Sequence, residues 1–183
     1  DPAYREIALS KTSPTLKDDQ YALYKVSDVD HETLERLRSV FREIFAAKGK
    51  TQDEKVTVRY EDTTMKLTSV IHHANYVRVD IPFGSSLGLL ARDYTIDVEG
   101  DNQWMLLYID FFDVKNLGYR RYETKITWEG WKTIEISLDS LTQYGNVDPR
   151  YLEFMRITIE NWVEGSVYEG TIRFRNFQIL PPS

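Results

Sequence analysis

The feature that most constrains this chain is a series of strand-like segments that follow one another from residue 55 to residue 180. Each segment is rich in β-branched and aromatic residues, and turn residues such as Gly, Asn and Asp separate it from the next. No helical pattern long enough for a parallel crossover lies between them. The chain is therefore predicted to be all-β, with two antiparallel sheets packed as a jelly-roll β-sandwich. The predicted strands are 55–60, 65–71, 75–81, 92–99, 104–112, 119–127, 131–137, 151–160 and 167–180.

Alternation within these segments predicts which side chains face the interior, because neighbouring residues of a strand point to opposite faces. In the segment 104–112, four apolar side chains share one face. The opposite face carries a row of rings interrupted by Asp110. Taken over the whole sandwich, the predicted core includes Met105, Leu107, Ile109, Ile134, Ile136, Met155, Ile157 and Phe174.

The last segment changes its alternation part of the way along. Ile172 and Phe174 share one face, whereas Phe177 and Ile179 fall on the opposite parity. One extra residue in the strand would return both pairs to the core, so the sequence predicts a β-bulge near residues 175–176.

The first 50 residues have a different character. Residues 1–26 mix polar and apolar side chains around turn-forming residues and are predicted to form an extended arm. From 30 to 48, apolar residues recur at the spacing of an amphipathic helix, with Asp30 as the N-cap and Gly49 as the stop. We therefore predict an N-terminal arm and amphipathic helix over residues 1–50 and the jelly-roll sandwich over residues 51–183.

Charge and composition exclude several classes of function. The formal net charge is −6, which disfavours a nucleic-acid partner because binding to phosphates needs a positive field. Cysteine is absent, so disulfides, thiol catalysis and zinc–thiolate sites are excluded. We expect no metal or other cofactor, because the adjacent His72 and His73 would point to opposite faces of a strand. No run approaches the ~20 apolar residues of a membrane span. The first residue is Asp1 rather than Met, which we interpret as a processed mature protein or an excised segment.

The acidic residues around the central segment raise the question of catalysis. Asp110 and Asp113, with Glu99 and Asp101, could supply the two facing carboxylates of a glycosidase. The sequence gives no sign that any two of them face each other, and we interpret them as solvated turn carboxylates. No nucleophile elbow, phosphate-binding loop or H-E-x-x-H motif occurs. The chain is predicted to be a non-enzyme.

The aromatic face is the candidate functional surface, because a strand that presents several rings outward needs something to cover them. Sugar, another protein and a part of this chain itself remain three open alternatives for that cover. Rings can stack on pyranose units, and the flanking charged side chains can bond to hydroxyl groups. The candidate contact residues are Trp104, Tyr108, Asp110, Phe112, Tyr119, Arg121, Tyr122, Trp131 and Glu135.

The order of motifs from residue 104 to the C-terminus resembles that of carbohydrate-binding modules with a jelly-roll fold. LLYIDFFD at 106–113 is followed by an aromatic strand, by GWKTIEISLDSL at 130–141, and by the closing pair YLEFMRITIE and GTIRFRNFQIL. The same order, with NYVRVDIPFG at 75–84 before it, resembles the FlaA-type flagellar filament outer-layer, or sheath, proteins of spirochaetes. These motifs are mostly strand-and-turn patterns, so they bear more on the fold than on the function.

The two resemblances imply different functions. The sheath family implies a non-catalytic structural protein that assembles by lateral contacts with other filament or sheath subunits. It also implies export to the periplasm, as part of a periplasmic flagellum, or to the cell surface. The alternative is a carbohydrate-binding module that stacks polysaccharide on the aromatic sheet face. We favour the sheath prediction at this point, because the helix over 30–48 adds contact surface for which a carbohydrate module has little use.

Overall fold

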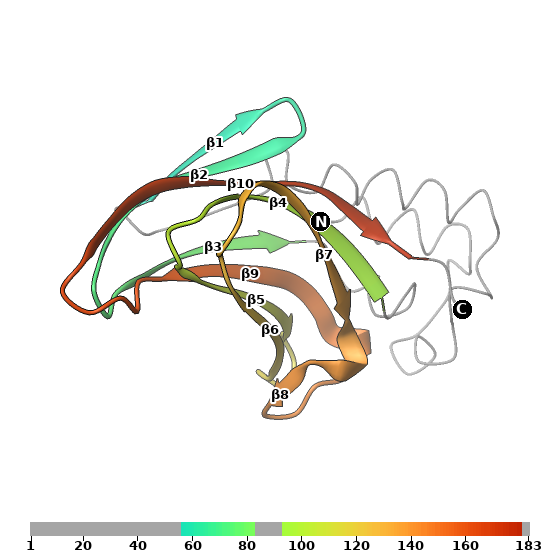
Figure 1. The fold of residues 1–183 in the computed structure, drawn as a ribbon. Coiled ribbons are helices and arrows are strands. Elements are labelled where there is room, and N and C mark those ends of the chain that lie inside the picture. The colour runs from blue at the N-terminus through green and yellow to red at the C-terminus, as the bar shows by residue number, and fades with distance from the viewer. Residues whose placement is uncertain (1–55, 83–92, 181–183) are drawn as a thin grey trace.

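The computed structural model describes residues 56–82 and 93–180 of the chain. Ten strands form two five-stranded antiparallel sheets, which lie face to face as a sandwich (Figure 1). One sheet has the order β1-β2-β10-β4-β7 and the other has the order β3-β9-β5-β6-β8. The predicted antiparallel β-sandwich is therefore confirmed. The predicted arm over 1–26, the helix over 30–48 and the boundary at residues 50–51 lie outside the described residues.

The strand bounds agree closely with the predicted segments. One sheet contains β1 (Val56–Glu61), β2 (Thr64–His72), β10 (Val167–Ile179), β4 (Asp93–Asp101) and β7 (Glu129–Ser137). The other contains β3 (Tyr76–Pro82), β9 (Leu152–Glu160), β5 (Leu106–Asp113), β6 (Tyr119–Lys125) and β8 (Thr142–Tyr144). Two short 3₁₀ turns, Leu138–Ser140 and Pro149–Tyr151, flank β8. Strand β8 was not predicted, because three residues are too few to show an alternation.

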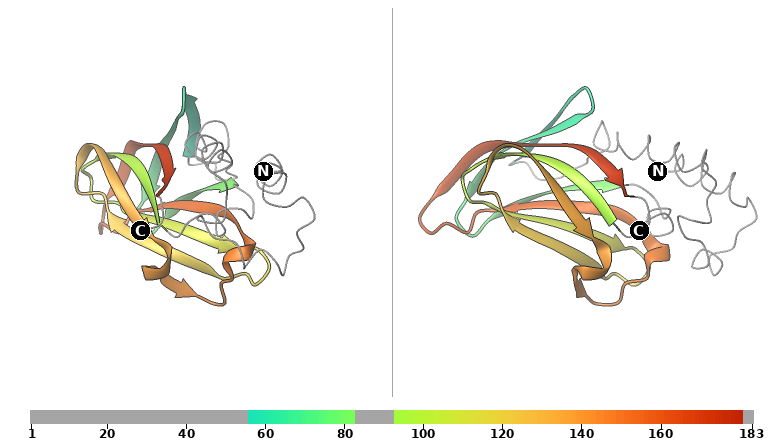
Figure 2. Two further views of the ribbon diagram at one scale, coloured as in Figure 1. Left: turned by 90° about the vertical axis from the view of Figure 1, so that its right-hand side faces the viewer. Right: turned by 45° about the vertical axis from the view of Figure 1, so that its right-hand side comes forward.

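The two sheets curve in the same sense, which makes their outer faces unlike each other (Figures 1 and 2). The outer face of β3-β9-β5-β6-β8 lies on the inside of the curve, and we call this the concave sheet. The outer face of β1-β2-β10-β4-β7 lies on the outside of the curve, and we call this the convex sheet. Among the described residues, no helix has the length and apolar character needed to cross a membrane.

The core between the sheets follows the predicted alternation. All eight side chains predicted to point inward are buried, each with at most 3% of its surface exposed. In β10, the pairing with β4 shifts register between Arg175 and Gln178, and Asn176 has a left-handed backbone with φ of 62°. Phe174 and Phe177 are both buried on either side of this irregularity. The predicted β-bulge is thus confirmed, and it keeps one long strand in the core along its whole length.

Candidate functional site

The outward side chains of the concave sheet form rows that run across its strands, because the paired residues lie side by side. The row nearest the carboxyl end of β5 is aromatic, and it contains Phe154, Phe112, Tyr119 and Tyr144 from β9, β5, β6 and β8. The next row is charged, with Asp80, Arg156, Asp110 and Arg121. Beyond it lie Arg78, Thr158, Tyr108 and Glu123, followed by Tyr76, Glu160, Leu106 and Lys125.

The aromatic row is a continuous stack of four rings. The Phe112 ring lies 4.8 Å from that of Phe154 and 4.8 Å from that of Tyr119, measured between centroids. Tyr119 in turn lies 4.9 Å from Tyr144, with the ring planes 18° apart. Because each ring is held by its neighbours and by a sheet strand, the row is a rigid apolar surface. Tyr144 ends it, with 43% of its surface exposed.

The charged row consists of two ion pairs with fork geometry. Arg121 donates from Nε and Nη2 to the two carboxylate oxygens of Asp110, at 2.8 and 2.9 Å. Arg156 donates in the same way to Asp80, at 2.7 and 3.0 Å. Asp110 is only 1% exposed, and its partner satisfies a charge that would otherwise be costly to bury. The hydrogen bond to Asp110 raises the pKa of Arg121 above its usual value, so the pair stays charged.

The same arginines join the charged row to the rings on both sides. The guanidinium carbon of Arg121 lies 4.2 Å from the centroid of Tyr108 and 5.3 Å from that of Tyr119. That of Arg156 lies 4.8 Å from the centroid of Phe112. The Tyr108 hydroxyl donates to Glu160 at 2.7 Å. Partial burial and this bond to a carboxylate raise the pKa of Tyr108, so it remains a protonated donor. The face is therefore preorganised before any ligand arrives.

The structure brings together five of the predicted contact residues on the concave sheet: Tyr108, Asp110, Phe112, Tyr119 and Arg121. Trp104 lies just before β5, and 50% of its surface is exposed. The prediction that Trp131 and Glu135 belong to the same platform is wrong, because both lie on β7 of the convex sheet. Strand alternation assigns a face but not a sheet, which is why the sequence could not separate them.

Tyr122 is also misplaced by the prediction. It pairs with Ile109 and packs against the hydrophobic core, whereas its neighbour Arg121 faces outward. The alternation of β6 carried the information needed to separate Tyr122 from Tyr119, since the two residues have opposite parity. Burial raises the pKa of Tyr122, in keeping with a structural rather than a contacting ring.

Four residues of the face were missed by the sequence reasoning. Arg156 and Phe154 share the outward parity of β9, so that pattern could have pointed to them. Asp80 and Tyr144 lie on edge strands, and only the observed strand order places them beside Arg156 and Tyr119.

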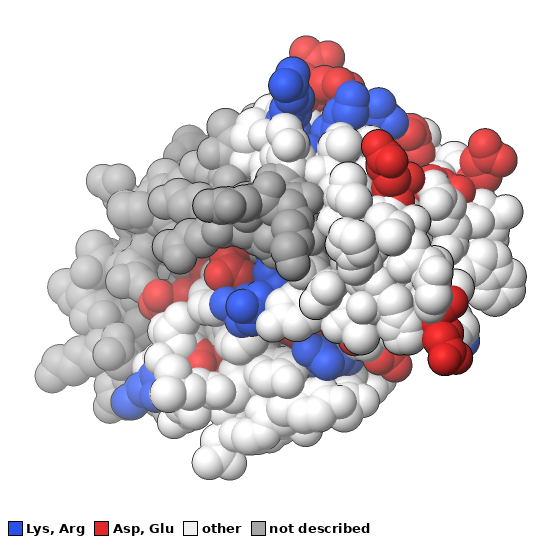
Figure 3. Space-filling model, turned by 90° about the vertical axis from the view of Figure 1, so that its left-hand side faces the viewer, with Lys and Arg blue, Asp and Glu red and all other residues white. Residues whose placement is uncertain are grey.

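On the side of the molecule drawn in Figure 3, acidic and basic side chains adjoin one another within a largely uncharged surface.

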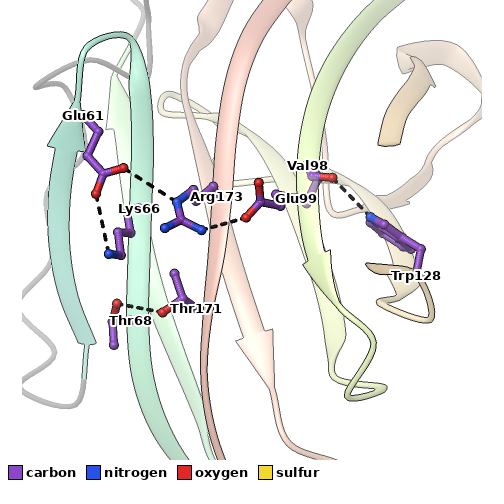
Figure 4. Close-up of polar contacts among 8 residues, drawn as sticks. All are labelled: Glu61, Lys66, Thr68, Val98, Glu99, Trp128, Thr171 and Arg173. Atoms are coloured by element: carbon purple, nitrogen blue, oxygen red, sulfur yellow. Dashed lines mark hydrogen bonds and ion pairs between the residues drawn. The ribbon is translucent and has the colours of Figure 1, made fainter. Parts of the chain in front are cut away.

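The interpretation of the acidic residues as solvated turn carboxylates is wrong for Asp110 and Asp113, which are 1% and 0% exposed. Asp113 accepts bonds from the backbone N–H groups of Lys115, Asn116 and Asp148, and from the Asn116 side chain. It therefore pins the turn after β5 to the loop after β8. Glu99 lies on the convex sheet, where it accepts a bond from Arg173 at 2.7 Å (Figure 4). Each of these carboxylates is engaged in its own structural contact.

Possible metal ligands are not gathered in the part of the chain that the structure describes. There, no group of three or more His, Asp or Glu side chains is arranged to hold a metal ion. The chemistry offered by the concave face is thus that of stacked rings, fixed guanidinium groups and carboxylates.

Comparison with known proteins places this fold. No family model matches the sequence, and no curated protein sequence matches it significantly. Solved structures do match. The family 11 carbohydrate-binding module of the cellulosomal cellulase Lic26A-Cel5E of Clostridium thermocellum is similar, with a TM-score of 0.54 and 12% identity. That match covers 73% of this chain and 86% of the module.

Two further structures extend the comparison. One comes from work on the promiscuous specificity of carbohydrate-binding modules from the β-sandwich superfamily. It has a TM-score of 0.51 and 14% identity, over 77% of this chain and 60% of the other. The other is an exo-β-agarase with a TM-score of 0.56 and 11% identity, over 79% of this chain but only 25% of the enzyme. At these identities the likeness shows the fold alone, a β-sandwich of the kind found in carbohydrate-binding modules.

Proposed function

We propose that this chain is a non-catalytic carbohydrate-binding module that stacks polysaccharide on the outer face of its concave sheet. The observation that carries the proposal is the continuous row of Phe154, Phe112, Tyr119 and Tyr144. The rings stack against one another, so the row presents their outward edges and the exposed Tyr144 ring as a rigid surface. Such a surface supplies contact area at little cost in conformational entropy.

The charged row supplies the polar half of such a site. Bidentate pairs fix the orientation of the Arg121 and Arg156 guanidinium groups. Their remaining N–H groups therefore point in fixed directions. A sugar carries apolar C–H faces as well as hydroxyl groups, and this face offers rings beside fixed donors and acceptors. In ligand-binding sites, a small number of placed polar groups within an apolar surface provides specificity.

The comparisons support polysaccharide binding, our alternative from the sequence, better than the sheath function that we had favoured. The solved structures named above are carbohydrate-binding modules and an exo-β-agarase. Assembly into a flagellar sheath remains a prediction. It rests on the sequence resemblance and on the helix predicted over residues 30–48, which lie outside the described residues. Under either function we propose an exported protein, in the periplasm or at the cell surface.

Isothermal titration calorimetry of the full chain with soluble glucans, xylans, mannans and galactans tests the proposal. We expect saturable binding to at least one of these neutral polysaccharides. A flat response across the panel would contradict it. If, in addition, the protein were recovered from its native cells together with filament proteins, the sheath prediction would replace it.

A further inference from the structure

Two exposed tryptophans lie at the end of the concave face opposite the aromatic row. Trp104 precedes β5 and Trp162 follows β9, with 50% and 40% of their surfaces exposed. The ammonium group of Lys125, the last residue of β6, lies 4.2 Å from the centroid of a Trp162 ring. Lys125 pairs with Leu106 in the last row of the face. Trp162 therefore flanks this end of the outer face rather than the interior.

The backbone holds the two tryptophans together. The indole N–H of Trp162 donates to the carbonyl oxygen of Trp104, whose backbone N–H donates in turn to the carbonyl of Ile126. Trp104 has a φ of 67°, a left-handed conformation that is uncommon for a bulky residue. Strain of this kind persists where the surroundings enforce it, and it is concentrated at binding sites.

Asn161, which precedes Trp162, fixes the loop that carries it. Its side chain is fully buried, donates to the carbonyl of Ile71 at 2.8 Å and accepts from the backbone N–H of Val163 at 3.0 Å. The loop is thus anchored to β2 in the opposite sheet, while the Trp162 ring remains exposed. Because the loop is anchored and still presents a large ring to solvent, Trp162 is better explained as a contact residue than as a core residue.

The two aromatic ends are separated along the strands, not across them. Phe112 lies six residue steps along β5 from Leu106, which corresponds to about 20 Å of β-strand. One of the two rows between these ends carries both arginine–carboxylate pairs. A ligand that reaches both ends must therefore run along β5 and be longer than one or two sugar units.

Charge on this face selects among such ligands. The outward side chains of β3, β9, β5 and β6 include four basic residues, Arg78, Arg156, Arg121 and Lys125, and four acidic ones, Asp80, Asp110, Glu123 and Glu160. Both forked arginines are already committed to carboxylates. The face therefore has no net charge to attract a polyanion such as a uronate chain.

We propose that Trp104 and Trp162 form a second aromatic subsite, and that the concave face binds one uncharged glycan chain running parallel to β5 between this subsite and the Phe154–Tyr144 row. This inference rests on the proposed function and adds to it the direction, the minimum length and the charge class of the ligand. One end of the glycan contacts the tryptophans and the other end contacts the stacked rings. The hydroxyl groups between them meet the polar side chains of the two rows in between.

The test compares neutral β-linked gluco- and galacto-oligosaccharides of two and six units, and an oligogalacturonide of six units, by calorimetry. In whichever neutral series binds, we expect the unmodified chain to bind the hexamer about tenfold or more tighter than the dimer. One further ring contact provides a gain of about this size. We expect Trp162→Ala to remove this gain while leaving dimer affinity within about twofold. The uronate hexamer should bind more weakly than the neutral hexamer.

Trp104→Ala provides an independent variant in case loss of the Trp162 indole disturbs its loop, and thermal unfolding of both variants checks that they fold. Trp131→Ala on the convex sheet is the matched control and should keep the gain. Equal affinity for dimer and hexamer in the unmodified chain, or a gain that survives in both tryptophan variants, would overturn the second subsite and leave the proposed function standing. Preference for the uronate would overturn the charge class. No binding to any oligosaccharide or polysaccharide would remove the proposed function itself, and this inference with it.

Discussion

The outer faces of the two sheets follow the same strand alternation but present different kinds of side chain. On the convex sheet, polar side chains pair with one another across β1, β2, β10 and β4 (Figure 4). Arg173 bridges Glu99 at 2.7 Å and Glu61 at 3.8 Å, and Glu61 also contacts Lys66. The one large ring among these rows, Trp131, lies 3.8 Å beneath the guanidinium of Arg175. The charged side chains of this face, and its tryptophan, are thus engaged in contacts with one another.

The concave face is also paired, but one of its carboxylates lies deeper and more of its rings are exposed. Asp110 is almost fully buried, whereas Glu61 on the convex sheet keeps 54% of its side-chain surface exposed. Four rings on or beside the concave face each keep 40% or more of their surface exposed: Tyr144, Tyr76, Trp104 and Trp162. Exposed rings on a rigid and internally satisfied surface distinguish a binding face from a merely solvated one. The following variants test that distinction.

The largest expected difference concerns stability. Arg121→Ala leaves the buried Asp110 carboxylate without its partner, and we expect a loss of about 3–5 kcal/mol of unfolding free energy. The matched change on the convex sheet, Arg175→Ala, breaks a 3.7 Å pair that is partly exposed, and we expect about 1 kcal/mol or less. Urea unfolding measures both. Similar losses would show that the two faces are electrostatically equivalent, and removing Asp110 together with Arg121 should recover part of the first loss.

The second difference concerns binding. Tyr144 ends the ring row and is 43% exposed, so Tyr144→Ala should weaken polysaccharide binding about tenfold with little change in stability. Trp131→Ala removes a larger ring from the convex sheet and should leave the affinity within about twofold. Affinity electrophoresis through polysaccharide gels compares the two variants directly. The reverse order of effects would place the site on the convex sheet.

Much of this comparison could be predicted from the sequence, because alternation reports which face a side chain occupies. It predicted the inward set, the bulge at residues 175–176 and the outward row of Tyr108, Asp110 and Phe112. It could not report which strands are neighbours, since pairing is decided by contacts distant in sequence. Trp131 was therefore assigned to the wrong sheet. For the same reason, the burial of Asp110 by Arg121 was not foreseen, even though both residues had been named as candidates.

Alkaline pH should expose a smaller effect on the concave face. The raised pKa of Tyr108 means that the folded chain keeps a proton that the unfolded chain loses near the ordinary tyrosine value of 10.0. Above that pH the unfolded state binds fewer protons, so stability falls as pH rises. Tyr108→Phe should make the fall shallower, as measured by urea midpoints between about pH 9 and pH 11. Tyr168, whose pKa is also raised by burial and by Asp101, and Tyr122, whose pKa is raised by burial, contribute to the remaining slope. An unchanged slope in Tyr108→Phe would contradict the role given to the bond with Glu160.

The smallest effect is expected on the convex sheet itself. Glu99→Gln removes one of the two carboxylates near Arg173, and Glu61 remains 3.8 Å away. We expect a change of less than about 1 kcal/mol, which should shrink further at high salt. Thermal unfolding at low and high ionic strength checks this. A loss as large as that of Arg121→Ala would mean that the convex network matters for the fold as much as the concave one.

Nuclear magnetic resonance of the labelled chain can locate the bound ligand on one sheet or the other. The backbone amide signals are followed while a binding neutral oligosaccharide is added. If ligand binds the concave face, we expect the perturbed amides to cluster on β5, β6 and β9, around Phe112, Arg121 and Arg156. The amides around Glu99 and Trp131 should stay unchanged. Perturbations concentrated on β2, β10, β4 and β7 would contradict binding at the concave face.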